Sequence, residues 1–161
     1  MTAMPPRPYS TRLRIALAIA RGIAASRGDD DTTSTHIVLG ILREAANGAV
    51  AALQHAGVPV DEVCVELEAK LGPRGRTRPD EVALPLTEGE RHVIEQARTE
   101  SDLRGDEFIA PEHALLGILR DEQCPASQAF ARHGFEYLAA RAHLDAVVYR
   151  HAAPPGSPPV V

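Results

Sequence analysis

Two histidines are the side chains in this sequence best suited to acid–base catalysis or metal binding. His36 and His113 each open the same pattern, His-x-x-Leu-Gly-Ile-Leu-Arg, in which apolar residues dominate. A zinc site needs further Cys, His, Asp or Glu ligands at short, regular spacings, and neither histidine has them on one helix face. We therefore expect both imidazoles to be structural, with hydrogen bonds to loop backbone at the start of a buried helix. The sequence predicts no metal site and no cofactor.

The two cysteines are the remaining candidate nucleophiles. Cys64 lies between Val63 and Val65 without a basic neighbour that would activate its thiol, and Cys124 lies in an acidic loop before Pro125. Two cysteines at unrelated positions are typical of free thiols in a reducing compartment. The sequence also lacks a Ser-His-Asp pattern and the Gly-x-x-x-x-Gly-Lys-Ser/Thr phosphate loop of ATPases. We therefore expect a protein that is not an enzyme.

Composition and charge limit the partners. The chain of 161 residues has a formal net charge of -5, whereas nucleic-acid-binding proteins usually present a basic face. The sequence has no run of about 20 apolar residues that could span a membrane, and its Pro-rich start lacks the apolar core of a signal peptide. We therefore expect a cytoplasmic protein that binds neither nucleic acid nor membrane.

The pattern around each histidine belongs to a longer internal repeat with an offset of 77 residues. Residues 35–43 return as residues 112–120, and the offset holds without a gap on both sides. The matching pairs outside this block include Ser10 with Thr87, Arg14 with Arg91, Arg27 with Arg104, Gly57 with Gly134 and Leu67 with Leu144. Such a repeat indicates two copies of one structural unit.

Helix-capping and helix-ending residues recur in the same order in both copies. The expected helices are 11–26, 35–45, one between 48 and 57, and 59–71, then 88–103, one starting at 111, one starting at 125, and 135–149. We predict an all-α fold of eight helices, arranged as two four-helix repeats related by a pseudo-twofold axis. The predicted divisions are an extended leader (1–9), repeat one (10–71), a mobile linker (72–86), repeat two (87–149) and a disordered Pro-rich tail (150–161).

The duplicated histidine block resembles the Clp N-terminal domain, also called the Clp R domain, and is most similar to its ClpC branch. The block reads Thr-Ser-Thr-His-Ile-Val-Leu-Gly-Ile over 33–41 and Ala-Pro-Glu-His-Ala-Leu-Leu-Gly-Ile over 110–118. With the duplication, the resemblance covers about residues 9–149. In that family the domain precedes the ATPase modules of the Clp unfoldases and receives substrates and adaptors.

The resemblance implies a non-catalytic module of the Clp unfoldase–protease system that binds proteins or peptides. Its partners would be Clp ATPase or protease components, adaptor or substrate proteins, and cyclic peptides. The Met1 start and the untagged tail favour a free-standing protein that presents or sequesters such ligands. The alternative is the N-terminal fragment of a full-length Clp ATPase.

In ClpC-like domains, the Glu of the block lies close to a capping Thr and receives the guanidinium of phosphoarginine-tagged substrates. Carried onto this sequence, the second copy keeps Glu112 together with Thr87, although Pro111 removes a hydroxyl and an N–H. The first copy keeps Ser10 but has Thr35 in place of the Glu, and a threonine cannot neutralise a guanidinium. The resemblance therefore implies one disabled site and one weakened site. The alternative for Glu112 is a carboxylate that only complements the helix dipole.

The family also receives adaptors and cyclic-peptide antibiotics in a groove between its first and fifth helices. The residues that the resemblance assigns to this groove are Arg14, Leu17, Arg91 and Glu95. Next to them, Ile15, Ile19 and Ile23 recur at every fourth position, where the second copy has polar residues. This stripe is either more deeply buried than its counterpart or exposed as a partner surface. Exposure would also suit a different protein, a Clp-independent regulator that forms a homodimer through this helix.

Overall fold

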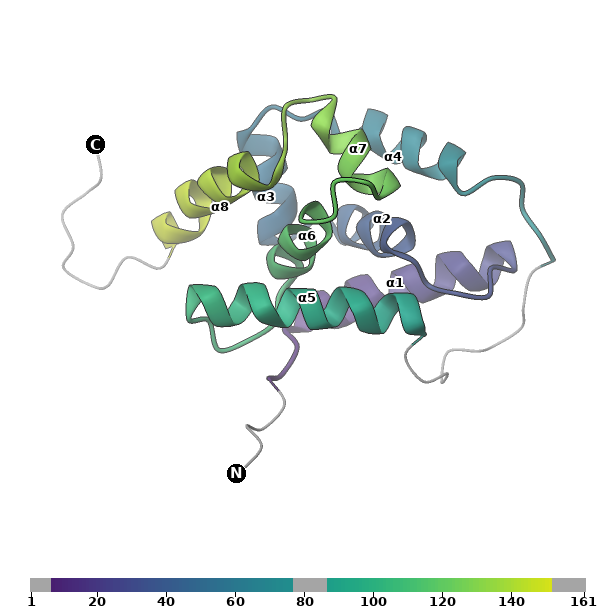
Figure 1. The fold of residues 1–161 in the computed structure, drawn as a ribbon, viewed down its shortest axis with the longest axis horizontal. Helices are drawn as coiled ribbons and strands as arrows, with labels where there is room; N and C mark the ends of the chain where they lie inside the picture. Colours follow the sequence, from purple (N-terminus) through teal and green to yellow (C-terminus); the bar gives the residue numbers. More distant parts are fainter. Residues whose placement is uncertain (1–6, 77–86, 152–161) are drawn as a thin grey trace.

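Eight α-helices make up the fold shown in Figure 1, a computed structural model that describes residues 7–76 and 87–151. Within these ranges there is no β-strand, only one isolated bridge between Tyr9 and Ile109. The helices are α1 (Thr11–Arg27), α2 (Ser34–Glu44), α3 (Gly48–His55), α4 (Val60–Lys70), α5 (Glu88–Arg104), α6 (Pro111–Leu119), α7 (Pro125–Ala131) and α8 (Tyr137–His151). The predicted all-α fold of two four-helix repeats is confirmed.

The predicted boundaries differ from the structure mainly at α8 and at the linker. Phe135 is 1% exposed and its N–H donates to the carbonyl of Phe130 (3.1 Å), so it closes the turn after α7 and precedes α8. The helix then runs to His151, into the predicted tail. At the linker, the N–H of Gly75 donates to the carbonyl of Arg27 (2.7 Å), which joins residues 72–76 to the end of α1. The rest of the predicted leader, linker and tail (1–6, 77–86 and 152–161) lies outside the described residues.

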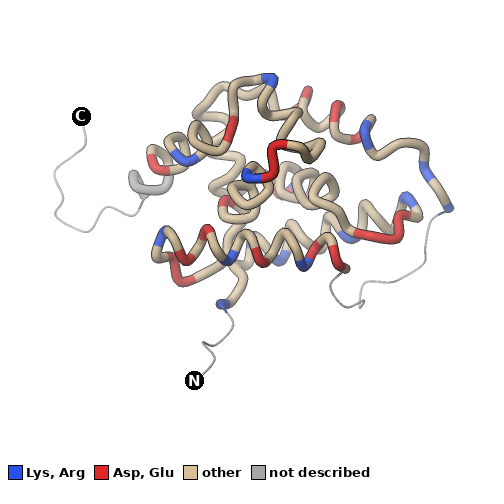
Figure 2. Tube along the Cα trace, in the orientation of Figure 1, with Lys and Arg blue, Asp and Glu red and all other residues tan. Residues whose placement is uncertain are grey.

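The two helices that carry the histidine blocks form the centre of the core. α2 and α6 are buried around almost their whole circumference, as their nearly continuous apolar sequences require. α1 packs against α2, and α5 packs against α6. Figure 1 shows α2 and α6 in the middle of the molecule, and Figure 2 shows that charges of both signs follow α5 along the outside.

A glycine in each central helix allows its backbone to approach the neighbouring helix closely. A Cβ atom on Gly40 would overlap the carbonyl oxygen of Ala16 on α1. A Cβ atom on Gly117 would lie 2.9 Å from the Cβ of Gln96 and 3.1 Å from the backbone nitrogen of Ala97 on α5. The glycine of the repeated block is therefore needed for the close helix crossing.

The histidine of each block joins its helix to the preceding loop. His36 Nδ1 accepts a hydrogen bond from the backbone N–H of Thr33 (3.0 Å), and its Nε2 donates to the carboxylate of Asp29 (2.7 Å). His113 repeats both bonds, to the N-cap backbone (2.8 Å) and to Asp106 (2.7 Å). Both imidazoles are 2% exposed. The structure thus gives them the structural role that the sequence predicts.

Each repeat also holds the start of the other repeat's first helix. The backbone N–H of Ser10, the N-cap of α1, donates to the carbonyl of Ile109 in the loop before α6 (2.9 Å). In the related place, the backbone N–H of Thr32, in the loop before α2, donates to Oγ1 of Thr87, the N-cap of α5 (3.3 Å). The two repeats are therefore interleaved, and residues from both copies meet at each of these junctions.

We expect Gly40→Ala to lower the free energy of unfolding by about 1–3 kcal/mol, because the added methyl group forces α2 away from the α1 backbone. Gly22→Ala in α1 is the matched control, since a Cβ there has no atom within 4 Å. It should raise the free energy of unfolding by about 0.5–1 kcal/mol, because alanine favours helix. Urea unfolding followed by circular dichroism measures both. Equal effects of the two substitutions would contradict the close crossing.

Candidate functional site

Three helices begin around one open pocket of about 530 Å³. These are α1, α3 and α6, so the pocket takes residues from both repeats. Its lining residues are Ser10, Arg12, Ala45, Ala46, Asn47, Gly48, Ala51, Gln54, Ala110, Pro111 and Glu112. The first N–H groups of a helix have no partner within that helix, and the helix dipole adds partial positive charge there. The pocket is therefore suited to an anionic group.

Glu112 is the acidic residue of this pocket. It is the second residue of α6 and is half-buried, and its carboxylate lies over the first residue of α3, Gly48. A Cβ atom on Gly48 would come within 3.0 Å of the Glu112 Oε2, so the glycine makes room for the carboxylate. Among the described residues, the Glu112 carboxylate has neither a hydrogen bond nor an ion pair. It is available to a ligand.

Arg12 is the basic residue of the same pocket. Its Nη1 lies 2.8 Å from Oε1 of Glu44, whose side chain is 2% exposed, while the Arg12 side chain is 55% exposed. Asn47 completes this support, because its Nδ2 donates to the other Glu44 oxygen (2.6 Å) and its Oδ1 caps α3 at the N–H of Val50 (3.0 Å). Glu44 thereby fixes one side of the guanidinium and leaves the rest of it exposed at the pocket.

The pocket thus combines opposite charges that suit one zwitterionic ligand. A carboxylate such as Glu112 pairs with a planar guanidinium by two hydrogen bonds. Helix N-termini and an arginine bind phosphate groups. A ligand with both groups could contact Glu112 with its cation and the side of Ser10 and Arg12 with its anion.

The structure places the four predicted ligand-site residues differently from the sequence-based pairing. Ser10, and not Thr87, lines the pocket of Glu112. Thr87 caps α5 and contacts the loop of the first repeat at Thr32. The pairing of Glu112 with Thr87 within one copy was therefore wrong, because the copies are interleaved. Thr35 is 5% exposed and is closed off from solvent at the related junction.

The four predicted groove residues do not form one surface. Leu17 is 2% exposed and belongs to the core, so it cannot line a groove, whereas Arg14 is exposed. Arg91 and Glu95 line an open cavity of about 400 Å³ on α5, together with Glu88 and His92. The match of Leu17 with Ile94 in the second copy already indicates a core position, and both are buried. Only the family resemblance assigned Leu17 to the groove.

An ion pair links α1 to α5. The Arg21 Nε donates to both carboxylate oxygens of Glu90 (2.9 and 3.3 Å), and its Nη2 lies 2.7 Å from Oε1. The Glu90 side chain is 1% exposed and the Arg21 side chain is 32% exposed, so a half-buried arginine on α1 is paired with a buried carboxylate on α5.

The isoleucine stripe on α1 is exposed at one end and buried at the other. Ile15 is 41% exposed, Ile19 is half-buried against the core, and Ile23 is 7% exposed. Neither the deeply buried stripe nor the continuous exposed patch is present, because the stripe passes from the outside of α1 into the core. Glu100, the counterpart of Ile23, is equally buried at 1% exposure.

In the second repeat, Glu100 is the centre of a polar cluster that the sequence comparison did not identify. Its carboxylate accepts hydrogen bonds from Nε of Arg120 and from the hydroxyl of Tyr137 (2.9 Å), and the Arg120 guanidinium lies 4.6 Å from the centre of the Tyr137 ring. Burial and the bond to Glu100 raise the pKa of Tyr137. The charge of Glu100 is thus satisfied inside the protein.

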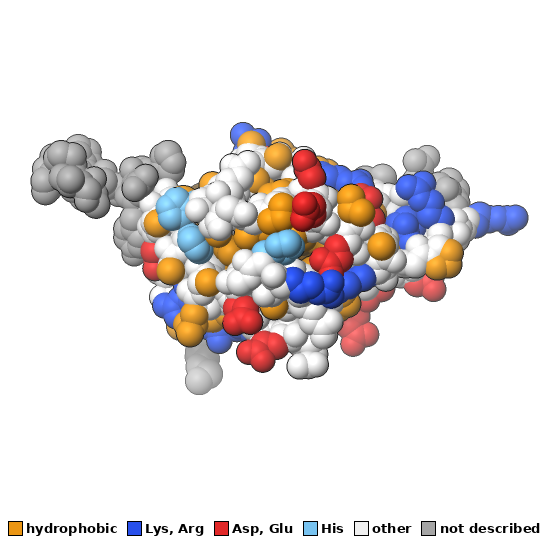
Figure 3. Space-filling model, turned by 90° about the horizontal axis from the view of Figure 1, so that it is seen from above, with side chains coloured by type: hydrophobic (Ala, Val, Ile, Leu, Met, Phe, Trp, Pro, Cys, Tyr) orange, Lys and Arg blue, Asp and Glu red, His pale blue; other side chains and the backbone are white. Residues whose placement is uncertain are grey.

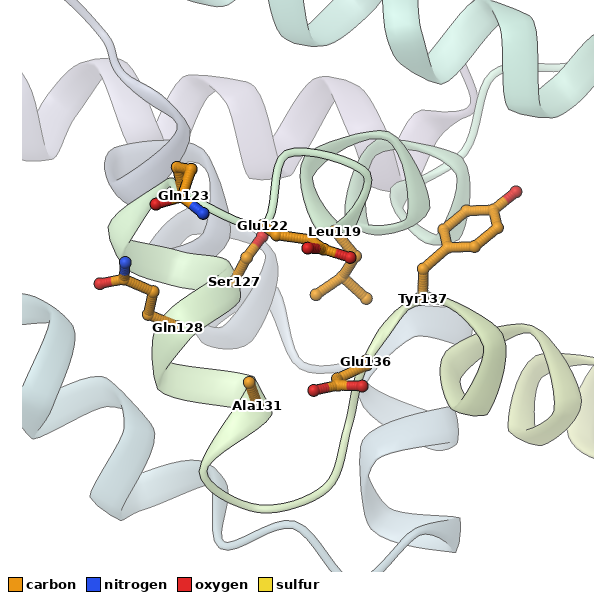
Figure 4. A pocket seen from close by; sticks show the side chains of 8 residues that line it. All are labelled: Leu119, Glu122, Gln123, Ser127, Gln128, Ala131, Glu136 and Tyr137. Atoms are coloured by element: carbon orange, nitrogen blue, oxygen red, sulfur yellow. The ribbon is translucent and has the colours of Figure 1, made fainter.

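A second cavity, of about 280 Å³, lies between the end of α6, α7 and the start of α8 (Figure 4). It is lined by Leu119, Glu122, Gln123, Ser127, Gln128, Ala131, Glu136 and Tyr137. Figure 4 shows that Leu119 points into it, while the Tyr137 hydroxyl points away toward Glu100. No expected site residue lines this cavity.

The two cysteines have surroundings that fit unreactive thiols. Cys64 packs partly buried against the core, and burial together with Glu68 and Asp61 raises the pKa of its thiol. Cys124 Sγ lies 3.1 Å from the hydroxyl of Ser127. Both are free cysteines.

Within the described part of the chain, no single helix is long and apolar enough to cross a membrane. One bent pair, α2 with α3 at 83°, meets the length and composition requirement only as a pair.

The fold and the pocket together define a class of protein, a helical double-repeat domain with a charged binding pocket where its repeats meet. The sequence model of the Clp repeat (R) N-terminal domain matches residues 8–133, and the chain belongs to this family. The resemblance of the histidine block is thereby confirmed.

Known relatives are much longer than this chain. It is similar to the negative regulator of genetic competence ClpC/MecB of Bacillus subtilis (strain 168), with 29% identity over 133 residues that cover 83% of this chain and 16% of that protein. It is also similar to the chaperone protein ClpB of Oceanobacillus iheyensis, with 28% identity and the same two coverages. The chain thus spans 16% of the length of these relatives.

Solved structures agree on the fold. The N-terminal domain of the chaperone ClpD from Arabidopsis thaliana matches with a TM-score of 0.64 and 19% identity, over 87% of this chain and 96% of that one. The N-terminal domain of the ClpV1 ATPase from E. coli matches with a TM-score of 0.70 and 16% identity, over 96% and 93%. At these identities the likeness shows the fold alone.

We expect Ile15→Asp to change the free energy of unfolding by less than about 1 kcal/mol, because the side chain already contacts water. Ile23→Asp, two helical turns away, should cost more than about 4 kcal/mol, because it buries an unpaired carboxylate. Thermal unfolding of the two variants measures this difference. A large loss of stability in Ile15→Asp would show instead that this end of the stripe is core.

Proposed function

We propose that this protein is a non-catalytic binding module of the Clp unfoldase–protease system, and that the pocket at Glu112 receives a phosphorylated guanidinium on a protein or peptide. The observation that carries the proposal is the Glu112 carboxylate, which has no partner among the described residues and shares with Arg12 a pocket where three helix N-termini meet. Membership of the Clp N-terminal family supports the protein-binding role. A cytoplasmic location is part of the proposal.

The resemblance to ClpC-like domains suggests phosphoarginine as the ligand, and the charge and shape of the pocket support it. Phosphoarginine has a planar guanidinium and a phosphate joined to it, so both charges lie within one small group. The guanidinium would pair with Glu112, and the phosphate would accept hydrogen bonds from the start of α1 at Ser10 and from Arg12. Pro111 has no N–H to donate, so α1 and α3 supply more donors than α6 does.

The proposed function uses one site and not two. At the junction related by the repeat, Thr35 stands where the pocket has Glu112, and Pro125 stands where it has Gly48. Thr35 is buried and carries no charge, so it cannot replace Glu112 as the partner of a guanidinium. A stoichiometry of one phosphoarginine group per chain follows.

Two further parts of the proposal concern partners. Adaptor proteins and cyclic peptides would contact the outer faces of α1 and α5, where Ile15, Arg14, Arg91 and Glu95 are exposed. A homodimer through α1 would use the same end of the helix, at Ile15. These contacts would serve either a free-standing protein or the N-terminal domain of a Clp ATPase. Sequencing of the gene beyond the codons of this chain distinguishes the two.

Isothermal titration calorimetry with a phosphoarginine peptide tests the ligand. We expect Glu112→Gln to weaken binding about 10- to 100-fold, because a charge-assisted hydrogen bond contributes about 1.5–3 kcal/mol. Gly48→Ala should also weaken binding, since the new methyl group displaces the Glu112 carboxylate. The fold should persist in both variants.

Glu107→Gln is the matched control, because Glu107 is exposed on the loop after α5 and the substitution removes the same charge. It should bind the peptide as the wild type does. The same peptide with unmodified arginine should bind weakly or not at all. Equal affinity of Glu112→Gln and the wild type would rule out this pocket as the site, and binding of two peptides per chain would contradict the single-site proposal.

A further inference from the structure

Two histidines from different repeats face each other at the surface. His55 is the last residue of α3, and His143 lies on α8, which packs directly against α3. Their Nδ1 atoms are 2.8 Å apart, and the ring centres are 5.1 Å apart in an edge-to-face arrangement. Figure 3 shows histidine side chains side by side at the surface on the side where α3 and α8 lie. Two ring nitrogens therefore converge on one point that solvent can reach.

The repeat provides a direct comparison for this pair. The positions related to His55 and His143 are Arg132, the C-cap of α7, and Glu66 on α4, and these two side chains form an ion pair. At that junction, opposite charges join the helices without any ligand. At the His55–His143 junction, the same two positions carry identical bases. A hydrogen bond between them needs one imidazole to donate and the other to accept, and a cation between them is the other way to satisfy both nitrogens.

The surroundings favour a cation. His55 is in the last turn of α3, where the helix dipole is negative and stabilises positive charge. The His143 ring stacks on Phe135 at 24° with centres 6.1 Å apart, and Phe135 is 1% exposed. One of the two imidazoles is therefore held in place by the core, which reduces the cost of ordering it for a ligand.

We propose that His55 and His143 bind one divalent transition-metal ion of the zinc, copper or nickel type, which joins the two repeats. Imidazole nitrogen is a preferred ligand of these ions, whereas Mg²⁺ prefers oxygen. Zn–N distances of about 2.0–2.1 Å at a tetrahedral angle place two nitrogens about 3.3 Å apart. The observed 2.8 Å separation therefore needs to open by about 0.5 Å. Each ring then has its proton on Nε2 and its lone pair on Nδ1, and water completes the coordination.

Zinc titration of the full, untagged chain tests this site. We expect saturable binding of one Zn²⁺ per chain by calorimetry, no response to Mg²⁺, and a Tm that rises by about 5–10 °C at a free zinc concentration 100 times Kd. His55→Ala and His143→Ala should each abolish the rise. His133→Ala, which removes another exposed histidine, should leave it unchanged.

The double variant His55→Arg, His143→Glu transfers the ion pair of the related junction and guards against loss of folding in the alanine variants. It should fold with a circular dichroism spectrum and a metal-free Tm close to those of the wild type, and it should bind no Zn²⁺. Absence of saturable zinc binding to the wild type would overturn the proposal. So would zinc binding and a Tm rise that persist in the folded double variant, because the ion would then be bound elsewhere.

Discussion

The close approach of two helix backbones in each repeat is the constraint on which the rest of the structure depends. Gly40 lets α2 contact the backbone of α1 at Ala16, and Gly117 does the same for α6 against α5. Because the crossing is so close, the central helices are covered on all sides and need apolar residues throughout. The buried histidines then fix where each central helix begins, by joining its first turn to an aspartate in the preceding loop.

Fixing the loops also positions the pocket. The loop before α6 holds Pro111 and Glu112 at the helix start, and the same loop binds the start of α1 through Ser10 and Ile109. α3 begins opposite them with a glycine. The pocket therefore needs no special loop of its own, because it is the space left where three capped helices meet. Its charges follow from two surface residues, Arg12 and Glu112.

The repeat, the eight helices and the role of the two histidines could be predicted because they depend on local patterns within each copy. The pairing of site residues could not. Glu112 was assigned to Thr87 because the two belong to one copy, yet Ser10 of the other copy lines its pocket. The sequence offset is identical for both arrangements, so only the contact between the start of each first helix and the loop of the other repeat decides the partner. Arg12 and Gly48 were also missed, because they are far from Glu112 in sequence and only the fold brings them to its pocket.

Comparison of positions related by the repeat shows which differences between the copies need compensation in the core and which do not. Ile23 and Glu100 are equally buried, and Glu100 is tolerated because Arg120 and Tyr137 satisfy its charge. The first copy also has an arginine at the position of Arg120, namely Arg43, whereas it has Val60 at the position of Tyr137. A buried carboxylate needs such partners. At the surface no such compensation is required. A histidine pair could stand where the other junction has an arginine and a glutamate, without altering the helix packing. The twofold geometry therefore holds wherever glycines and buried histidines set the backbone. The two copies differ at the junctions between repeats, and two of these, at Glu112 and at the histidine pair, are open to solvent.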